Sequence, residues 1–208
     1  MTSITVKKSA VILAGGFSRR FGSDKALVVL AGKPLLIHVI NRVSKVVDEV
    51  LVVVSSKDQK NKFETILGEK ANVVIDKNDF QSPLVGAITG FASAKGEYSL
   101  LLPCDTPLVS SQIVQFLLDM CTNRSAAIPR WPSGYIEPLQ AVYHTKSALT
   151  GAKTAVKQGK MNMRSMIDNL SGVRYVSTMV LEQMEPKLLT FFNINTPQDL
   201  KKAESILE

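Results

Sequence analysis

Four short runs of apolar, mostly β-branched residues mark the first half of the chain. They lie at residues 10–13, 50–54, 72–75 and 98–102. Each run is almost continuously hydrophobic and does not alternate between apolar and polar residues, which is typical of strands that are covered on both faces. The pattern therefore predicts four buried strands.

Helical spacing appears between these runs. Residues 34–47 carry apolar side chains at three- and four-residue steps, which predicts an amphipathic helix. Further helices are expected at residues 84–94 and 110–120, and Ser110 or Ser111 can cap the second of these. Strand and helix alternate in this order in a parallel, doubly wound sheet.

The second half is less regular but continues the same theme. We expect strands at residues 126–128, 139–143 and 174–177, and helices at residues 148–158, 164–170 and 196–207. Thr196 can cap the last helix, with Pro197 at its first position. Because no repeat, low-complexity segment or linker interrupts the pattern, residues 1–208 are interpreted as one α/β domain.

Composition supports a globular protein that needs no covalent staples. Hydrophobic residues make up 45% and charged residues 21% of the 208 residues. The two cysteines, Cys104 and Cys121, match neither a zinc-binding spacing nor a secreted disulfide framework. No run approaches the roughly 18 apolar residues that span a bilayer, and no signal peptide is visible. We therefore expect a cytoplasmic protein without a membrane partner.

The net charge of +7 fits either a nucleic-acid-binding surface or a pocket for an anionic small molecule. Lysine and arginine occur as scattered pairs such as Lys7-Lys8 and Lys201-Lys202, without a long basic block. Aromatic residues do not interleave with them. This distribution favours the small anion over nucleic acid.

The first candidate binding element is the segment LAGGFSRRFG at residues 13–22, directly after the first predicted strand. In parallel sheets, ligands bind beyond the carboxyl ends of the strands. Paired glycines let backbone N–H groups approach phosphate oxygens or a base edge. Arg19, Arg20 and Lys25 follow within reach of a polyanion. The loop is not a P-loop, because Ser23 follows Gly22, and it has no dinucleotide fingerprint.

Carboxylates end two other predicted strands. Asp105 lies in PCDTP, where it can hold Mg²⁺ beside bound phosphates, cap the following turn, or do both. Asp76 ends the strand at residues 72–75 and falls on the same edge. The segment at residues 82–86 then opens a helix, whose N-terminal N–H groups can meet a ligand.

Five blocks together resemble the molybdenum cofactor guanylyltransferases, or MobA-type proteins. They are LAGGFSRRFGSDKAL, SPLVG, PCDTP, EPLQAVY and NINTPQDL, and they extend over essentially the whole chain. The resemblance implies a Rossmann-like nucleotidyltransferase fold of three layers, α/β/α, with a mostly parallel sheet. It also implies Mg²⁺-dependent transfer of GMP from GTP to the terminal phosphate of molybdopterin or Mo-molybdopterin, with release of pyrophosphate.

The same resemblance assigns roles to individual residues. Lys25 and Asp105 are the implied catalytic residues, and Asp105 is also the implied metal ligand; Arg19 joins them as a catalytic candidate because its positive charge follows the glycine loop. Asn193 and Asn195 are the implied contacts of the acceptor, and Arg164 of the basic segment at residues 157–164 is a further candidate contact on account of its charge. The implied nucleotide-binding residues are Leu13, Ala14, Gly15, Gly16, Lys25, Ser55, Asp76 and Asp105.

Two departures from the family pattern concern the base pocket. Ser55 stands where relatives often carry an asparagine, and Ser82 stands where glycine is common. These changes leave open a cytidylyltransferase or a transferase acting on a sugar phosphate, and a non-catalytic nucleotide-binding regulator is the alternative from another class. Other cofactor-biosynthesis proteins and apo-molybdoenzymes are the implied macromolecular partners.

Two further segments carry open alternatives. The basic segment KQGKMNMR, residues 157–164, is either a mobile loop over the acceptor phosphate or an exposed turn between helices. Trp131 either stacks on the acceptor's heterocycle or lies in a loop that covers an edge of the sheet.

Overall fold

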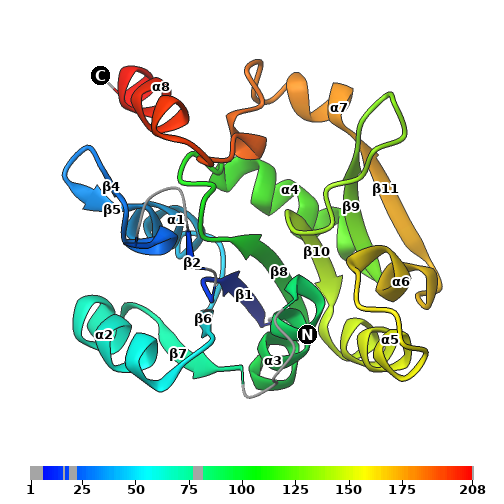
Figure 1. Ribbon diagram of the computed structural model, residues 1–208. Coiled ribbons are helices and arrows are strands. Elements are labelled where there is room, and N and C mark those ends of the chain that lie inside the picture. The colour runs from blue at the N-terminus through cyan, green and yellow to red at the C-terminus, as the bar shows by residue number, and fades with distance from the viewer. Residues whose placement is uncertain (1–6, 16, 19–22, 77–81, 208) are drawn as a thin grey trace, which may run out of the picture.

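The computed structural model describes residues 7–15, 17–18, 23–76 and 82–207. Seven strands of this part form one sheet in the order β11-β9-β10-β8-β1-β6-β7 (Figure 1). β10 runs antiparallel to both of its neighbours, and the other strands share one direction. The strands are β1 (Lys8–Leu13), β6 (Glu49–Val54), β7 (Asn72–Ile75), β8 (Tyr98–Pro103), β9 (Ala126–Arg130), β10 (Ala141–His144) and β11 (Val173–Ser177).

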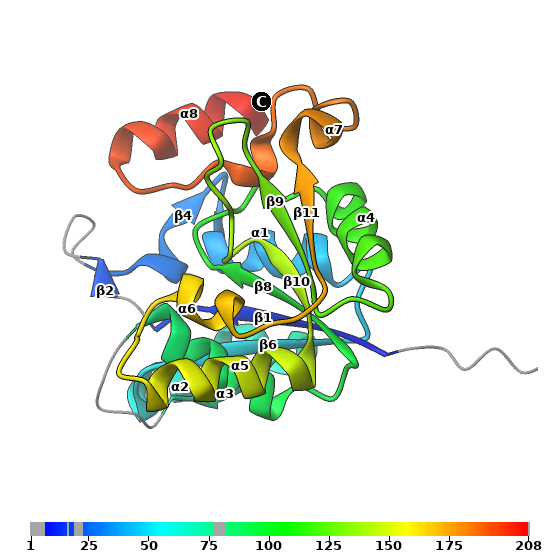
Figure 2. The same ribbon diagram turned by 90° about the vertical axis from the view of Figure 1, so that its right-hand side faces the viewer.

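Helices cover both faces of this sheet, which confirms the predicted three-layer α/β/α architecture with a mostly parallel sheet. In Figure 2, α3 and α5 lie on the opposite side of the strands from α1 and α4. The first face packs against α1 (Leu35–Val43), α2 (Lys57–Leu67), α4 (Ser111–Cys121) and α7 (Thr178–Glu182). The second face packs against α3 (Pro83–Ser93), α5 (Thr145–Lys157) and α6 (Met163–Asp168).

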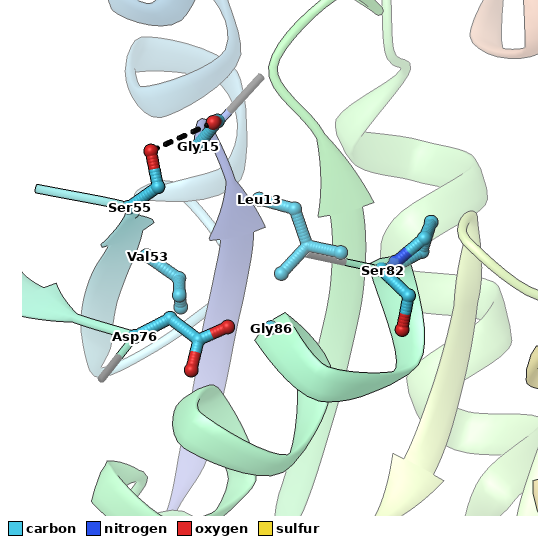
Figure 3. Close-up of a pocket in the computed structure, with 8 residues that line it drawn as sticks. Leu13, Gly15, Val53, Ser55, Asp76, Ser82 and Gly86 are labelled. Carbon is cyan, nitrogen blue, oxygen red and sulfur yellow. Dashed lines mark hydrogen bonds between the residues drawn. The ribbon is translucent and has the colours of Figure 1, made fainter. Parts of the chain in front are cut away.

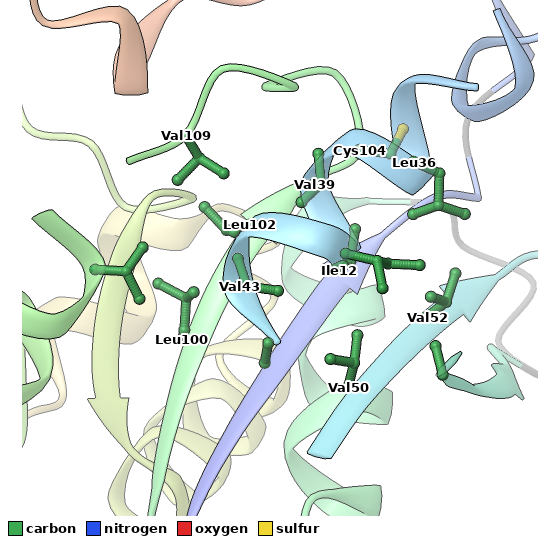
Figure 4. Packing of buried hydrophobic residues seen from close by; sticks show 14 of the residues in the cluster. Ile12, Leu36, Val39, Val43, Val50, Val52, Leu100, Leu102, Cys104 and Val109 are labelled. Carbon is green, nitrogen blue, oxygen red and sulfur yellow. The ribbon is translucent and has the colours of Figure 1, made fainter. Parts of the chain in front are cut away.

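The core is divided by the alternation of side chains along each strand. In β1, Ile12 points into the layer under α1, together with Val52 of β6 and Leu102 of β8 (Figure 4). Its neighbour Val11 belongs to the opposite layer, under α3. Since both faces of the sheet are buried under helices, the central strands need apolar residues at nearly every position. The continuous apolar runs in the sequence meet this need.

The C-terminal helix α8 (Pro197–Leu207) packs outside the main sheet. It meets the hairpin formed by β4 (Val29–Leu30) and β5 (Lys33–Pro34), with Leu30, Leu35, Ile194 and Ala203 buried between them. Thr196 caps α8 as predicted, because its hydroxyl accepts from the Asp199 N–H at 3.2 Å. Ile194, in the segment that precedes the helix, is buried in the same cluster as Ala203 of α8.

The remaining short elements lie in the loops. They are β2 (Phe17–Ser18), β3 (Ser23–Asp24) and the 3₁₀ turns η1 (Lys25–Leu27), η2 (Gly68–Lys70) and η3 (Leu189–Phe191). Within the described ranges, no helix is both long and apolar enough to cross a membrane.

The predicted elements all appear, but α2 and α7 were not predicted, and the helices predicted at residues 34–47 and 164–170 both end earlier than expected, the second at Asp168. The helix predicted at residues 34–47 ends at Val43, where Ser44 turns its hydroxyl back to the Ile40 carbonyl oxygen at 2.8 Å. In α2, only Phe63 and Leu67 are buried, so its sequence KDQKNKFETIL lacks an apolar stripe. α7 is too short to show any periodicity.

Candidate active site

The carboxyl ends of four parallel strands meet at one edge of the sheet. Leu13, the last residue of β1, is in register with Val53 of β6 and Pro103 of β8. The ladders continue past the strand ends, because the Cys104 N–H donates to the Leu13 carbonyl and the Asp76 N–H donates to the Val54 carbonyl. This confirms that the glycine loop and both carboxylates lie on one edge.

A cavity of about 280 Å³ opens at this edge. Figure 3 shows the Asp76 carboxylate pointing toward the space between Leu13 and the first turn of α3. Four predicted nucleotide-binding residues line the cavity, together with residues from β6 and from the start of α3. The lining residues are Leu13, Gly15, Val53, Ser55, Asp76, Ser82, Pro83 and Gly86.

A side chain at Gly15 would crowd the point where the loop passes the end of β6. A Cβ atom at this position would lie 3.2 Å from the Ser55 nitrogen and 3.3 Å from the Ser55 Cβ. The Ser55 hydroxyl lies 2.9 Å from the Gly15 carbonyl oxygen. Ser55 therefore fixes the backbone of the loop as well as lining the cavity.

Ala14, which was expected to contact the nucleotide, is oriented differently from its neighbours. Its methyl group is buried in the core under α1, and its N–H donates to the Val53 carbonyl at 2.8 Å. Neither its methyl group nor its N–H is therefore free to contact a nucleotide.

The opposite wall of the cavity is the N-terminus of α3. The Ser82 hydroxyl caps this helix by accepting from the Val85 N–H at 3.2 Å. The serine that replaces the glycine common in the family thus has a structural role. The Asp76 carboxylate accepts from the Thr89 hydroxyl at 3.0 Å. The helix end favours an anionic ligand, whereas Asp76 favours a group that donates hydrogen bonds.

A second cluster lies beyond the cavity, where three distant segments of the chain meet. The Lys25 ammonium pairs with Asp105 Oδ2 and donates to Asn195 Oδ1 at 2.6 Å. The Ile194 N–H also donates to the Asp105 carbonyl at 2.9 Å. The side chains of Lys25 and Asp105 are only 18% and 12% exposed. This cluster joins the predicted catalytic residues to the predicted acceptor block.

One carboxylate oxygen of Asp105 is placed to bind a cation. Its Oδ1 is buried and has no hydrogen-bond partner in the described part of the chain. Among the residues that the structure describes, no three histidine, cysteine, aspartate or glutamate side chains gather to form a metal cage. A single carboxylate beside phosphates is nevertheless the usual setting of Mg²⁺, so this oxygen fits the expected metal.

The thiol next to Asp105 takes no part in this chemistry. Burial, with a smaller contribution from the Asp105 carboxylate, raises the pKa of Cys104 to about 12. A thiol with such a pKa stays protonated at neutral pH and is a poor nucleophile. The Cys104 side chain packs in the core under α1 (Figure 4).

The other predicted site residues are not drawn into the cluster. Asn193 is exposed beside Ile194. Arg164 lies on α6 with its side chain 66% exposed and 3.9 Å from the Asp168 carboxylate. Gly16, Arg19 and Arg20 fall outside the described residues.

Sequence reasoning missed Gln59, which lies on the first turn of α2. Its amide oxygen accepts from the Ser55 N–H at 3.0 Å, and its amide nitrogen donates to Asp24 Oδ1 at 2.7 Å. The available signal was the pattern S-x-x-Q from Ser56 to Gln59, a capping-box sequence. The Ser56 hydroxyl does accept from the Gln59 N–H at 3.1 Å.

Comparison with known protein families places this site in context. Residues 10–173 match the family model of the MobA-like NTP transferase domain. A molybdenum cofactor guanylyltransferase from Desulfosudis oleivorans is 32% identical, with 96% of each chain aligned. A "Probable molybdenum cofactor guanylyltransferase" from Natranaerobius thermophilus is 34% identical, with 98% of each chain aligned.

Solved structures give the same picture at the level of the fold. Molybdopterin-guanine dinucleotide biosynthesis protein A from Archaeoglobus fulgidus superposes with a TM-score of 0.81 at 28% identity, covering 96% of this chain and 98% of that one. A 4-diphosphocytidyl-2C-methyl-D-erythritol synthase from Anaerococcus prevotii shares the fold, with a TM-score of 0.73 at 15% identity and coverage of 97% and 96%.

Proposed function

The chain belongs to the MobA-like NTP transferase family, and we propose that it transfers GMP from GTP to the terminal phosphate of molybdopterin. It would thus act as a molybdenum cofactor guanylyltransferase, with molybdopterin guanine dinucleotide and pyrophosphate as products. The curated relatives with this name align with nearly the entire chain. The observation that carries the proposal is the cluster of Lys25, Asp105 and Asn195 at the same edge of the sheet as the cavity.

The cavity is the proposed site of the guanine nucleoside. The Asp76 carboxylate can accept hydrogen bonds from guanine N–H groups or from ribose hydroxyls, since both are donors. Leu13 and Val53 supply apolar surface for the flat base. The first turn of α3 closes the opposite side, and Gly15 allows the loop backbone to approach the nucleotide closely.

The Lys25 cluster is the proposed site of the phosphates. The Lys25 ammonium would exchange part of its pairing with Asp105 for contact with phosphate oxygens, which a flexible lysine head can do. Asp105 would hold Mg²⁺ through its unpartnered Oδ1 atom. When bound, Mg²⁺ neutralises negative charge on the triphosphate and on the departing pyrophosphate. Arg19, proposed from its place in the basic segment after the glycine loop, would add a further positive charge.

The acceptor is proposed to approach from the side of Asn195. The Asn195 amide already touches the Lys25 ammonium, so a phosphate bound there would lie next to both groups. Asn193 and Arg164 are proposed as outer contacts, because both side chains are exposed. The acceptor phosphate oxygen would attack the α-phosphorus of GTP, and the bond between this phosphorus and the bridging oxygen of pyrophosphate would break.

This reaction asks little covalent chemistry of the protein. The acceptor is already an anion, so no general base is needed to create the nucleophile. The chain must hold two anions in line and compensate the charge that builds up on the leaving group. The two histidines are not needed for this. His38 lies 2.8 Å from the Leu30 carbonyl oxygen, and His144 caps α5.

The direct test is a panel of nucleoside triphosphates. The purified protein is incubated with Mg²⁺, molybdopterin and GTP, CTP, ATP or UTP, and pyrophosphate release is measured. We expect turnover with GTP. Turnover with CTP alone would replace the guanylyl assignment by a cytidylyl one, and no turnover with any nucleotide would favour a non-catalytic regulator.

A further inference from the structure

One side chain connects the two parts of the candidate site. The amide oxygen of Gln59 faces Ser55, at the wall of the cavity, where it lies 3.0 Å from the backbone nitrogen and 2.9 Å from the hydroxyl oxygen. Its amide nitrogen donates to Asp24 Oδ1, in the residue directly before Lys25. A single amide therefore spans the cavity and the segment that carries the lysine.

The helix that carries Gln59 is a firm support. Phe63 and Leu67 anchor α2 in the core, with 0% and 2% of their surface exposed. At the N-terminus, the Ser56 hydroxyl accepts from the Gln59 backbone N–H at 3.1 Å. The backbone of Gln59 is thus held from both sides, and its amide serves as a fixed bracket between two loops.

The chemistry of this bracket requires an amide. The Ser55 N–H needs an acceptor, whereas the Asp24 carboxylate needs a donor. A glutamate would satisfy Ser55 but would place a second carboxylate against Asp24. A methionine of similar length would remove the bonds to the Ser55 N–H and to Asp24 Oδ1, and Asp24 would keep only the Lys62 ammonium, 4.0 Å from its Oδ2 atom, among the described side chains. Only a side chain with one donor end and one acceptor end satisfies both loops.

We propose that Gln59 is a positioning residue for nucleotidyl transfer, acting through Ser55 and Asp24 on the placement of the Gly15 loop and Lys25. This inference rests on the proposed function, because it assigns the cavity to the nucleoside and Lys25 to the phosphates. The distance between these two parts must match the length of the nucleotide, and Gln59 fixes that distance. Misplacement of Lys25 lowers the rate of transfer even when the fold is intact.

The test is a polarity swap across the hydrogen bond between Gln59 and Asp24. Gln59→Glu sets two carboxylates against each other, and we expect kcat/KM for GTP to fall about tenfold or more, as for a lost charge-assisted bond. Adding Asp24→Asn supplies a donor to the new glutamate. The double variant is therefore expected to return to within about threefold of the wild-type value. Asp24→Asn alone keeps an acceptor for Gln59 and should lose less than Gln59→Glu.

Two further variants separate positioning from charge and from folding. Asn61→Asp adds the same charge to an exposed position of the same helix and is expected to leave kcat/KM unchanged. Gln59→Met removes both hydrogen bonds without adding charge, so it should lose activity, and Asp24→Asn should not rescue it. Melting temperatures of all variants are measured alongside, because a purely structural role would not produce rescue by the swap.

The results test the positioning role of Gln59 separately from the proposed guanylyl transfer. Equal kcat/KM values for Gln59→Glu and Asn61→Asp would overturn the role, and so would a double variant no better than Gln59→Glu. If the wild-type protein does not turn over GTP with molybdopterin, the proposed function fails. The affinities of the same variants for Mg²⁺-GTP, measured by calorimetry without acceptor, then test Gln59 by the same pattern of loss and rescue. Absence of GTP binding by the wild type would remove both.

Discussion

At the scale of single residues, the two carboxylate oxygens of Asp105 lie in different environments. One oxygen pairs with the Lys25 ammonium, and the other is buried without a partner in the described chain. An unpaired buried carboxylate oxygen costs free energy unless a ligand satisfies it. The residue type and its position after a predicted strand led us to expect a metal carboxylate, and this role stays a prediction. The contact between Lys25 and Asn195, which are 170 positions apart, could not be predicted without the fold.

The first prediction concerns Asp105→Asn. The amide can still accept from Lys25 through its oxygen, so the variant should fold, but the negative charge available to a cation is lost. We expect transfer to fall about 100-fold or more at saturating GTP, as for other preorganised electrostatic groups. Initial rates over a Mg²⁺ titration measure this. Asp119→Asn, at an exposed position of α4, is the matched control, and near-normal activity of Asp105→Asn would remove Asp105 from the metal role.

A second residue with an unusual environment is Glu137. Burial raises the pKa of its carboxyl above the ordinary value of 4.5, and a hydrogen bond from Trp131 opposes this effect. The Trp131 indole N–H donates to Glu137 Oε1 at 2.7 Å, and its ring meets Phe191 edge to face at 5.7 Å between centroids. These contacts hold Trp131 in the loop after β9. The choice between stacking on the acceptor and covering the sheet edge stays open.

The second prediction follows from the sign of that shift. An acid whose pKa is higher in the folded than in the unfolded state binds its proton more tightly when the protein is folded. Protonation of Glu137 therefore adds fully to the free energy of unfolding below pH 4.5, and this contribution is lost as the pH rises through the folded-state pKa. Glu137→Gln stays neutral and can still accept from Trp131. We expect this variant to be more stable than the wild type at pH 8, by a margin that shrinks at pH 5. Urea unfolding at both pH values measures it, with exposed Glu69→Gln as control. A margin independent of pH would contradict the assignment.

At the scale of elements, the close packing of α3 against β1 determines where the wall of the cavity lies. Gly90 lies so close to β1 that an added Cβ atom would stand 2.2 Å from Val11 Cγ1. One turn earlier, a Cβ atom on Gly86 would lie 3.3 Å from Leu13 Cδ2. These two glycines let the helix approach the strand and bring its N-terminus to the sheet edge.

The third prediction tests this packing. Gly90→Ala should destabilise the protein by about 1–3 kcal/mol, because overpacking forces the helix away from Val11. Val11→Ala removes the atom that clashes most, so the double variant should be less destabilised than the sum of the two single changes. Urea unfolding of the four proteins gives the coupling free energy. Additive effects would show that the helix adjusts without pressing on Val11.

Elements also show where sequence reasoning succeeds and where it stops. The central strands were predictable because continuous apolar runs have few alternatives in an α/β protein. α2 was not, because its burial depends on two side chains, Phe63 and Leu67, in an otherwise polar segment. Because α2 was not predicted, Gln59 on its first turn was not predicted as a site residue either. Its contacts with Ser55 and Asp24 depend on the folded arrangement of the two loops.

At the scale of the whole molecule, the two halves of the chain meet at Asp105. β1, β6, β7 and α3 form the cavity, whereas the C-terminal segment returns across the sheet edge and bonds to Asp105 through the Ile194 N–H. The parallel order of the first half predicted a shared edge. The return of the C-terminal segment was implied by the family resemblance alone, because no pattern in the sequence specifies which loop α8 will hold beside the sheet. The expected cytoplasmic location and macromolecular partners stay predictions.

The central claim is that this edge transfers the guanylyl group of GTP. Parallel reactions with molybdopterin and Mg²⁺ contain GTP labelled with ³²P at either the α- or the γ-phosphate, and the products are separated. We expect the α label to appear in a dinucleotide with molybdopterin and the γ label to leave in pyrophosphate. Asp105→Asn is expected to slow both by about 100-fold or more. Release of the γ label as inorganic phosphate, with no α label joined to the acceptor, would contradict guanylyl transfer.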